Sequence, residues 1–296
     1  MISKEVTSKI RKIEIKTKKL VNEIFSGEYT SVFKGQGMEF LQVREYLPGD
    51  DVRIIDWNVS ARYGKLFVKQ FNEERELNIF LIVDLSGSGI FGSAYKTKNE
   101  IASEIASILA FSALKNNDKV GLMLFTDKIE KSLSPKKGRR HILRIIREIL
   151  YFKPSGRGTN IDMALRYLNK VIKRKAVVFI LSDFFDSGYE KSMKIVSKKH
   201  DLIAISINDP RESVLPDAGL IQAEDPESLK RIIINTSDKD VRNKYKELNS
   251  LRKDQRDYFL KTMNVDHVEI STDRPYVNPL VSFFKTRIKR KNAGNG

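Results

Sequence analysis

Four apolar runs along the chain have the length and composition of buried β-strands. They span residues 77–83, 120–125, 176–181 and 202–207. A strand covered on one face alternates apolar and polar residues, whereas these runs are almost continuously apolar. The pattern therefore predicts strands of a sheet that is covered on both faces.

Between these runs, apolar residues recur at helical spacing. The predicted helices span residues 97–115, 139–150, 161–172 and 190–199, and a short strand is expected around Ile129. Repeated strand and helix units predict an α/β fold with a mostly parallel sheet and helices on both faces. Further along we predict a hairpin, a charged helix, a strand and a last helix, at residues 220–234, 239–263, 265–270 and 279–289.

The segment before the sheet has a different character. Residues 3–25 form an amphipathic helical pattern that stops at Gly27, whereas residues 29–76 are punctuated by glycine and proline and contain an alternating run at 65–71. We therefore predict an N-terminal helix (1–27), a small strand-containing module (28–76) and an α/β domain (77–296). The last of these carries a hairpin and helix elaboration near 212–263.

Composition excludes several classes of site. The chain has no cysteine, which removes disulfides, thiol nucleophiles and cysteine-ligated metals. The spacing between its histidines, His141, His200 and His267, is not that of metal ligands, which argues against a histidine-based hydrolase. No apolar run approaches the roughly 20 residues that span a bilayer, and the lysine-rich N-terminus has no signal-peptide core. We expect a cytoplasmic protein without a transmembrane segment.

The formal net charge of +16 suggests attraction to phosphates. However, lysine and arginine are spread along the chain, with dense runs only at residues 16–19 and 287–291. A lysine-rich proteome would give the same excess, because charge alone governs solubility and non-specific binding. Binding to nucleic acid or to an anionic surface is therefore kept as an alternative rather than as the main expectation.

Oxygen-bearing side chains follow two of the predicted strands. Asp84, Ser86 and Ser88 come directly after the first strand, Asp183 comes after a later one, and Thr159 lies in a glycine-bearing loop that enters a helix. Ligands of open α/β sheets bind beyond the carboxyl ends of the strands. Carboxylate and hydroxyl oxygens are ligands of Mg²⁺, and Mn²⁺ or Ca²⁺ would accept the same oxygen atoms. Two carboxylates would leave a divalent ion able to accept another anionic oxygen.

These three elements, in this order, resemble the metal-ion-dependent adhesion site (MIDAS) of von Willebrand factor A domains. The preceding segment is similar to a bacterial family known as domain of unknown function 58. The similar motifs are Gly-Met-Glu-Phe at 37–40, Arg-Glu-Tyr-Leu-Pro-Gly-Asp-Asp-Val-Arg at 44–53, Ile-Asp-Trp at 55–57, Ala-Arg at 61–62 and the stretch 275–284.

The resemblance implies a von Willebrand factor A-like, Rossmann-type fold and a pairing with a MoxR-type AAA+ ATPase. In that pairing the protein would act as an adaptor or co-factor protein with a chaperone-like role. It also implies that Ser86, Ser88 and Thr159 contact the metal directly, that Asp84 and Asp183 bind it directly or through water, and that a partner protein supplies an acidic side chain.

The module before the sheet interleaves basic and acidic residues. We expect them to form an internal ion-paired network that fastens the module to the sheet, in preference to an interaction surface. We expect Trp57 to pack in a core or an interface. The interleaved residues are Arg44, Glu45, Asp50, Asp51, Arg53, Asp56 and Arg62.

No catalytic constellation is evident, so we do not expect an enzyme. Dehalogenase-like phosphatases need a second aspartate where this chain has Ser86. The sequence contains neither the Gly-x-x-x-x-Gly-Lys-Ser/Thr loop of nucleotide-binding proteins nor the Gly-x-Ser-x-Gly elbow of serine hydrolases. A magnesium-dependent hydrolase remains an alternative, because bound magnesium can activate water.

Overall fold

The computed structural model describes residues 39–72, 77–93 and 96–293, so the N-terminal helix expected at 3–25 lies outside the described residues. The described residues fall into two compact units, a small one that lies within residues 33–77 and a large one made of the described residues from 78 onward. Each unit is described by itself.

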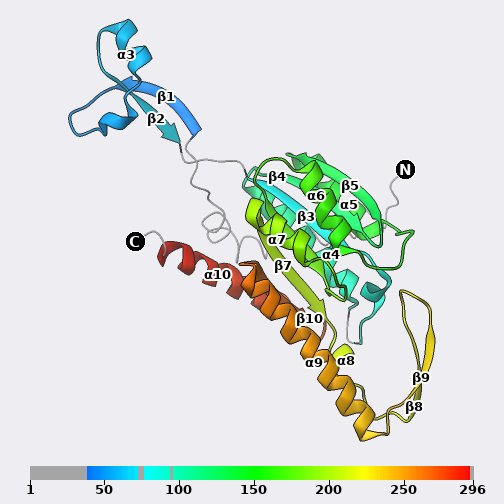
Figure 1. The fold of residues 1–296 in the computed structure, drawn as a ribbon. Helices are drawn as coiled ribbons and strands as arrows, with labels where there is room; N and C mark the ends of the chain where they lie inside the picture. The colour runs from blue at the N-terminus through cyan, green and yellow to red at the C-terminus, as the bar shows by residue number, and fades with distance from the viewer. Residues whose placement is uncertain (1–38, 73–76, 94–95, 294–296) are drawn as a thin grey trace. The chain divides into compact units, whose positions relative to one another are not determined.

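The large unit is built on a six-stranded sheet in the order β10-β7-β6-β3-β4-β5 (Figure 1). Each neighbouring pair is parallel except β4 and β5, which are antiparallel. This confirms the predicted α/β class with a mostly parallel sheet. The strands are β3 (Asn78–Asp84), β4 (Lys119–Phe125), β5 (Ile129–Lys136), β6 (Val177–Ser182), β7 (Asp201–Asn208) and β10 (Asp266–Ser271).

Helices flank this sheet, and their positions explain why the strands are almost continuously apolar. Phe80 and Ile82 of β3 pack in one core with α6 and α7, and the alternate residues of the strand point toward the opposite face. Helix α4 also packs against β3. The helices are α4 (Lys98–Lys115), α5 (Arg139–Tyr151), α6 (Ile161–Val171), α7 (Glu190–Lys199), α8 (Pro210–Ser213), α9 (Lys239–Thr262) and α10 (Val277–Ala293).

The hairpin predicted at residues 220–234 is confirmed. It consists of β8 (Leu220–Glu224) and β9 (Arg231–Asn235), which pair antiparallel as a separate two-stranded sheet. The predicted helix at 97–115 is also confirmed, and Thr97 and Glu100 form a capping box at its start.

The small unit pairs β1 (Glu39–Glu45) with β2 (Phe67–Asn72) in an antiparallel sheet, with a short 3-10 helix (Val52–Ile54) and α3 (Trp57–Tyr63) between the strands. Arg44 forms a two-pronged ion pair with Asp50, and both N–O distances are 2.7 Å. Some of the predicted ion pairs therefore exist inside this module. Trp57 begins α3 and is 66% exposed, so the expectation that it packs in a core is wrong, whereas packing in an interface stays a prediction.

His200 gives the fold a predictable acid sensitivity. It is 3% exposed at the end of α7, and neither ring nitrogen has a hydrogen-bond partner among the described residues. Burial, with the neighbouring Lys199 charge, lowers the pKa of His200 to about 4. In the unfolded chain the pKa of this imidazole is near 6.5. As the pH falls, the unfolded state therefore binds a proton that the native state does not bind.

We therefore expect the free energy of unfolding to fall by up to about 3 kcal/mol between pH 6.5 and pH 4 because of His200 alone, at about 1.4 kcal/mol for each pH unit. Urea unfolding at several pH values would measure this loss. In His200→Phe the free energy of unfolding should fall less steeply with decreasing pH than in the wild type, because the variant lacks the imidazole that takes up a proton on unfolding. His267 is retained in both proteins, so its contribution cancels in the comparison. Equal slopes would contradict the assignment to His200.

Candidate functional site

The two candidate carboxylates come together because their strands are neighbours. Asp84 is the last residue of β3, and Asp183 directly follows β6. The two strands pair in parallel, with Val83 opposite Leu181, so both carboxyl ends lie at the same edge of the sheet. Both aspartates are nearly buried, at 6% and 7% exposure. This is the edge at which open α/β sheets bind ligands.

Asp84 is held by hydrogen bonds on both carboxylate oxygens. Its Oδ1 accepts from the backbone N–H of Ser86 at 2.8 Å, and its Oδ2 accepts from the Ser182 hydroxyl at 2.6 Å. The hydroxyls of Ser86 and Ser88 lie 3.0 Å apart. One carboxylate and two hydroxyls therefore gather in the turn after β3, as the sequence predicts.

The glycines of this turn allow other segments to approach it closely. A Cβ added to Gly87 would lie 2.4 Å from the carbonyl oxygen of Pro226, and one added to Gly89 would lie 2.1 Å from the side-chain oxygen of Asn99. Side chains at these positions would push both neighbours away. The turn after β3 is therefore packed from two sides, including by residues far away in the sequence.

Asp183 has a buried cationic partner that the sequence does not reveal. The Lys98 ammonium, on the first turn of α4, donates to Asp183 Oδ2 at 2.6 Å and also pairs with Glu212. Lys98 is 3% exposed. Burial by itself would lower the pKa of Lys98, but the two carboxylates raise it, so the side chain remains an ammonium.

Thr159 stands slightly apart from the other four predicted residues. Its loop joins the turn after β3 through the Gly87 N–H, which donates to the Arg157 carbonyl at 2.7 Å. Its own hydroxyl donates to Glu227 Oε1 at 2.8 Å. Thr159 does not line the small cavity that Asp84, Ser86, Ser88 and Asp183 share. The structure therefore brings four of the predicted residues together, and Thr159 is linked to them through its loop.

The electrostatics of this edge favour a cation. Burial raises the pKa of Asp84 to about 7, and the charge of Asp183 adds to the effect. Burial likewise raises the pKa of Glu212 and of Glu227, and the charge of Asp183 acts on both. When ionised, these carboxylates outnumber the Lys98 ammonium that pairs with two of them. Additional positive charge is therefore expected to stabilise the site.

The donor atoms at this edge are carboxylate and hydroxyl oxygens, which together suit a hard divalent ion. Within the described residues, no group of three or more histidine, aspartate or glutamate side chains is placed to hold a metal. An ion at this edge would complete its shell with hydroxyl oxygens, backbone oxygens or waters beside the carboxylates. An all-oxygen set with few carboxylates suits Mg²⁺, which keeps several of its waters.

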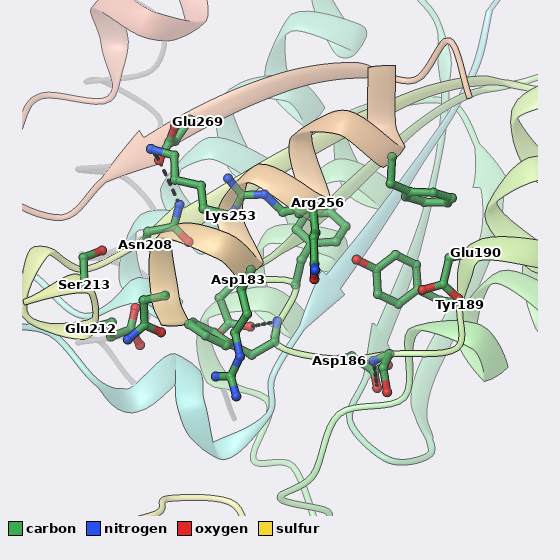
Figure 2. A pocket seen from close by; sticks show the side chains of 17 residues that line it. Asp183, Asp186, Tyr189, Glu190, Asn208, Glu212, Ser213, Lys253, Arg256 and Glu269 are labelled. Atoms are coloured by element: carbon green, nitrogen blue, oxygen red, sulfur yellow. Dashed lines mark hydrogen bonds and ion pairs between the residues drawn. The ribbon is translucent and has the colours of Figure 1, made fainter. Parts of the chain in front are cut away.

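A pocket of about 620 Å³ lies beside Asp183, between the ends of β6 and β7 and helix α9 (Figure 2). Charges of both signs line it: Lys253 pairs with Glu269 at 2.8 Å, and Asp186 and Arg256 also face the space. No local sequence pattern reveals this pocket, since it forms only when α9 packs against the sheet. It forms a recess next to the candidate site.

Comparison with known proteins identifies relatives of this chain. The family described as "Protein of unknown function DUF58" matches residues 42–256. An uncharacterised protein of Mycobacterium tuberculosis is 29% identical over 227 residues, which cover 76% of this chain and 72% of the relative. The uncharacterised protein YeaD of Bacillus subtilis is 36% identical over 108 residues, which cover 36% of this chain and 25% of YeaD.

Two solved structures are similar over 72% of this chain and 99% of their own length. A conserved hypothetical protein, BatB, from Bacteroides thetaiotaomicron is 14% identical, with a TM-score of 0.47. An aerotolerance-related membrane protein from Bacteroides fragilis is 15% identical, with a TM-score of 0.49. In this chain, none of the helices among the described residues is long and apolar enough to cross a membrane.

Proposed function

The chain belongs to the family of proteins of unknown function DUF58, and from this premise we propose that its α/β domain is a magnesium-dependent protein-interaction module. We also propose that the fold is von Willebrand factor A-like and that the metal-binding residues are Asp84, Ser86, Ser88, Thr159 and Asp183. Mn²⁺ or Ca²⁺ could replace Mg²⁺ in such a site. The ion would bind an acidic side chain of a partner protein.

The observation that carries the proposal is the convergence of two buried carboxylates and two hydroxyls in one small cavity. Asp84, Ser86, Ser88 and Asp183 line it, and it is sized for about one water-sized group. Bound magnesium would supply a positive charge able to bind an oxygen anion from outside. The residues of the chain hold and orient that charge: Ser182 and the Ser86 N–H fix Asp84, and Lys98 fixes Asp183.

The partner that we propose is a MoxR-type AAA+ ATPase, for which the chain would serve as a cytoplasmic adaptor with a chaperone-like role. This part of the proposal is supported by the resemblance of the sequence motifs. The pocket beside Asp183 supports a protein partner, because it offers a recess with charges of both signs next to the candidate site.

A pull-down from native lysate in the presence of Mg²⁺ tests the proposal. We expect at least one partner, identified by mass spectrometry, to be retained by the wild type and lost by at least about tenfold both in a chelator and with Asp84→Ala. Asp254→Ala is the matched control, because Asp254 is exposed on α9 and lies outside both the cavity and the pocket.

The pattern of losses separates this function from its alternative. A partner retained equally by all samples would show that the site is not the docking point. Capture of nucleic acid that falls steeply with salt, and that ignores the chelator, would favour phosphate binding by the basic surface instead.

A further inference from the structure

The tip of the β8–β9 hairpin is a turn that is ordered by local hydrogen bonds. The Asp225 N–H donates to the Lys230 carbonyl at 2.9 Å, and the Leu229 N–H donates to the Asp225 carbonyl at 2.8 Å. The Asp225 side chain accepts from the N–H groups of Glu227 and Ser228. The conformation of the tip, and with it the position of Glu227, is therefore fixed by local hydrogen bonds.

This tip lies directly on the candidate site. Glu227 Oε1 accepts from the Thr159 hydroxyl at 2.8 Å, and the Pro226 carbonyl is so close to the turn after β3 that a Cβ at Gly87 would lie 2.4 Å from it. Another carboxylate near the site, Glu212, is already paired with Lys98. Within the part of the chain that the structure describes, no cation pairs with Glu227, and its carboxylate faces a hydroxyl of the proposed metal set.

The rest of the hairpin is only lightly attached. No residue of β8 or β9 is fully buried, and Leu220 and Ile233 are 74% and 76% exposed. The base is tied by the Thr236 hydroxyl, which donates to the Gly219 carbonyl at 2.7 Å. An isolated two-stranded hairpin is at best marginally stable, so the contact of the tip decides whether this hairpin stays on the domain.

We infer that Glu227 is the chain's own acidic ligand at the candidate site, which the hairpin holds in the place that a partner's carboxylate must take. This inference rests on the proposed function, because it assigns the internal competitor of the same site. A tethered carboxylate has a high effective concentration at its site, so an outside acidic group must displace it. Release of the lightly attached hairpin is the step that would open the site.

Amide hydrogen exchange of the hairpin, with and without Mg²⁺, tests this inference on the full chain. We expect Mg²⁺ to slow exchange of the hydrogen-bonded amides of Asp225 and Leu229 by about tenfold in the wild type, because the ion would anchor the tip. In Glu227→Gln this slowing should disappear, and calorimetry should show Mg²⁺ binding weakened by about tenfold. Glu224→Gln, on the same hairpin but paired with Arg231, is the control and should behave as the wild type.

Two outcomes would overturn the inference in distinguishable ways. If the wild type binds Mg²⁺ but Glu227→Gln shows the same affinity and the same slowing of exchange, this inference fails and the proposed function stands. If the wild type binds no Mg²⁺, the proposed function fails and the inference fails with it.

Discussion

Asp84→Asn is expected to abolish the stabilisation of this protein by magnesium. A ligand that binds only the native state raises the free energy of unfolding by about 2.7 kcal/mol when its free concentration is 100 times the dissociation constant. Asparagine keeps the shape of the side chain but removes one of the two carboxylates of the proposed set, and a hard divalent ion depends strongly on ligand charge. Thermal or urea unfolding in Mg²⁺ and in chelator would measure the difference.

In the absence of metal, Asp84→Asn should not lower the free energy of unfolding. The pKa of Asp84 is raised by burial and by Asp183, so a charge at this position is costly when no cation is present. A neutral amide removes that cost, and the Ser182 hydroxyl can accept from it. In chelator we therefore expect Asp84→Asn to be at least as stable as the wild type. Asp254→Asn is the control, and a magnesium response that survives in Asp84→Asn would refute the assignment.

The sheet could be predicted because each of its central strands is a local run of apolar residues. Residues such as Phe80 and Ile82 lie in apolar runs, and a strand covered by helices on both faces needs such a run. Asp84 and Asp183 could be found because each follows such a run. By contrast, α3 was missed, because it is a short helix whose start is marked chiefly by the Asp56 cap.

The partners of the candidate site could not be predicted, because they are supplied by distant segments. Lys98 and Asp183 are 85 residues apart, and Thr159 and Glu227 are 68 apart. Neither Lys98 nor Glu227 interrupts a local pattern: Lys98 is one of many lysines in a basic chain, and Glu227 lies in a polar turn. Only the packing of α4 and of the hairpin brings them to the strand ends.

Lys98→Met is expected to destabilise the protein by about 3–5 kcal/mol in chelator, because breaking a buried ion pair leaves uncompensated charge. Methionine has a similar reach and stays apolar, so the change chiefly removes the ammonium. Lys98 and the Asp183 side chain are each 3% exposed, and Glu212 is 18% exposed. Removing the ammonium would leave both carboxylates in a poorly solvated place. Lys96→Met is the matched control, since Lys96 also pairs with a glutamate but its side chain is 34% exposed.

Magnesium distinguishes a purely structural Lys98 from one that belongs to the site. If an ion binds beside Asp183, its charge compensates the carboxylates that Lys98→Met leaves unpaired, so saturating Mg²⁺ should recover part of the lost stability. Lys96→Met, at a pair that keeps partial contact with solvent, should lose no more than about 1 kcal/mol and show the wild-type response to Mg²⁺. Urea unfolding of the three proteins in Mg²⁺ and in chelator would measure both effects. An equal loss for Lys98→Met in the two conditions would mean that the ammonium serves the fold alone, and that positive charge at this edge comes from the protein rather than from a metal.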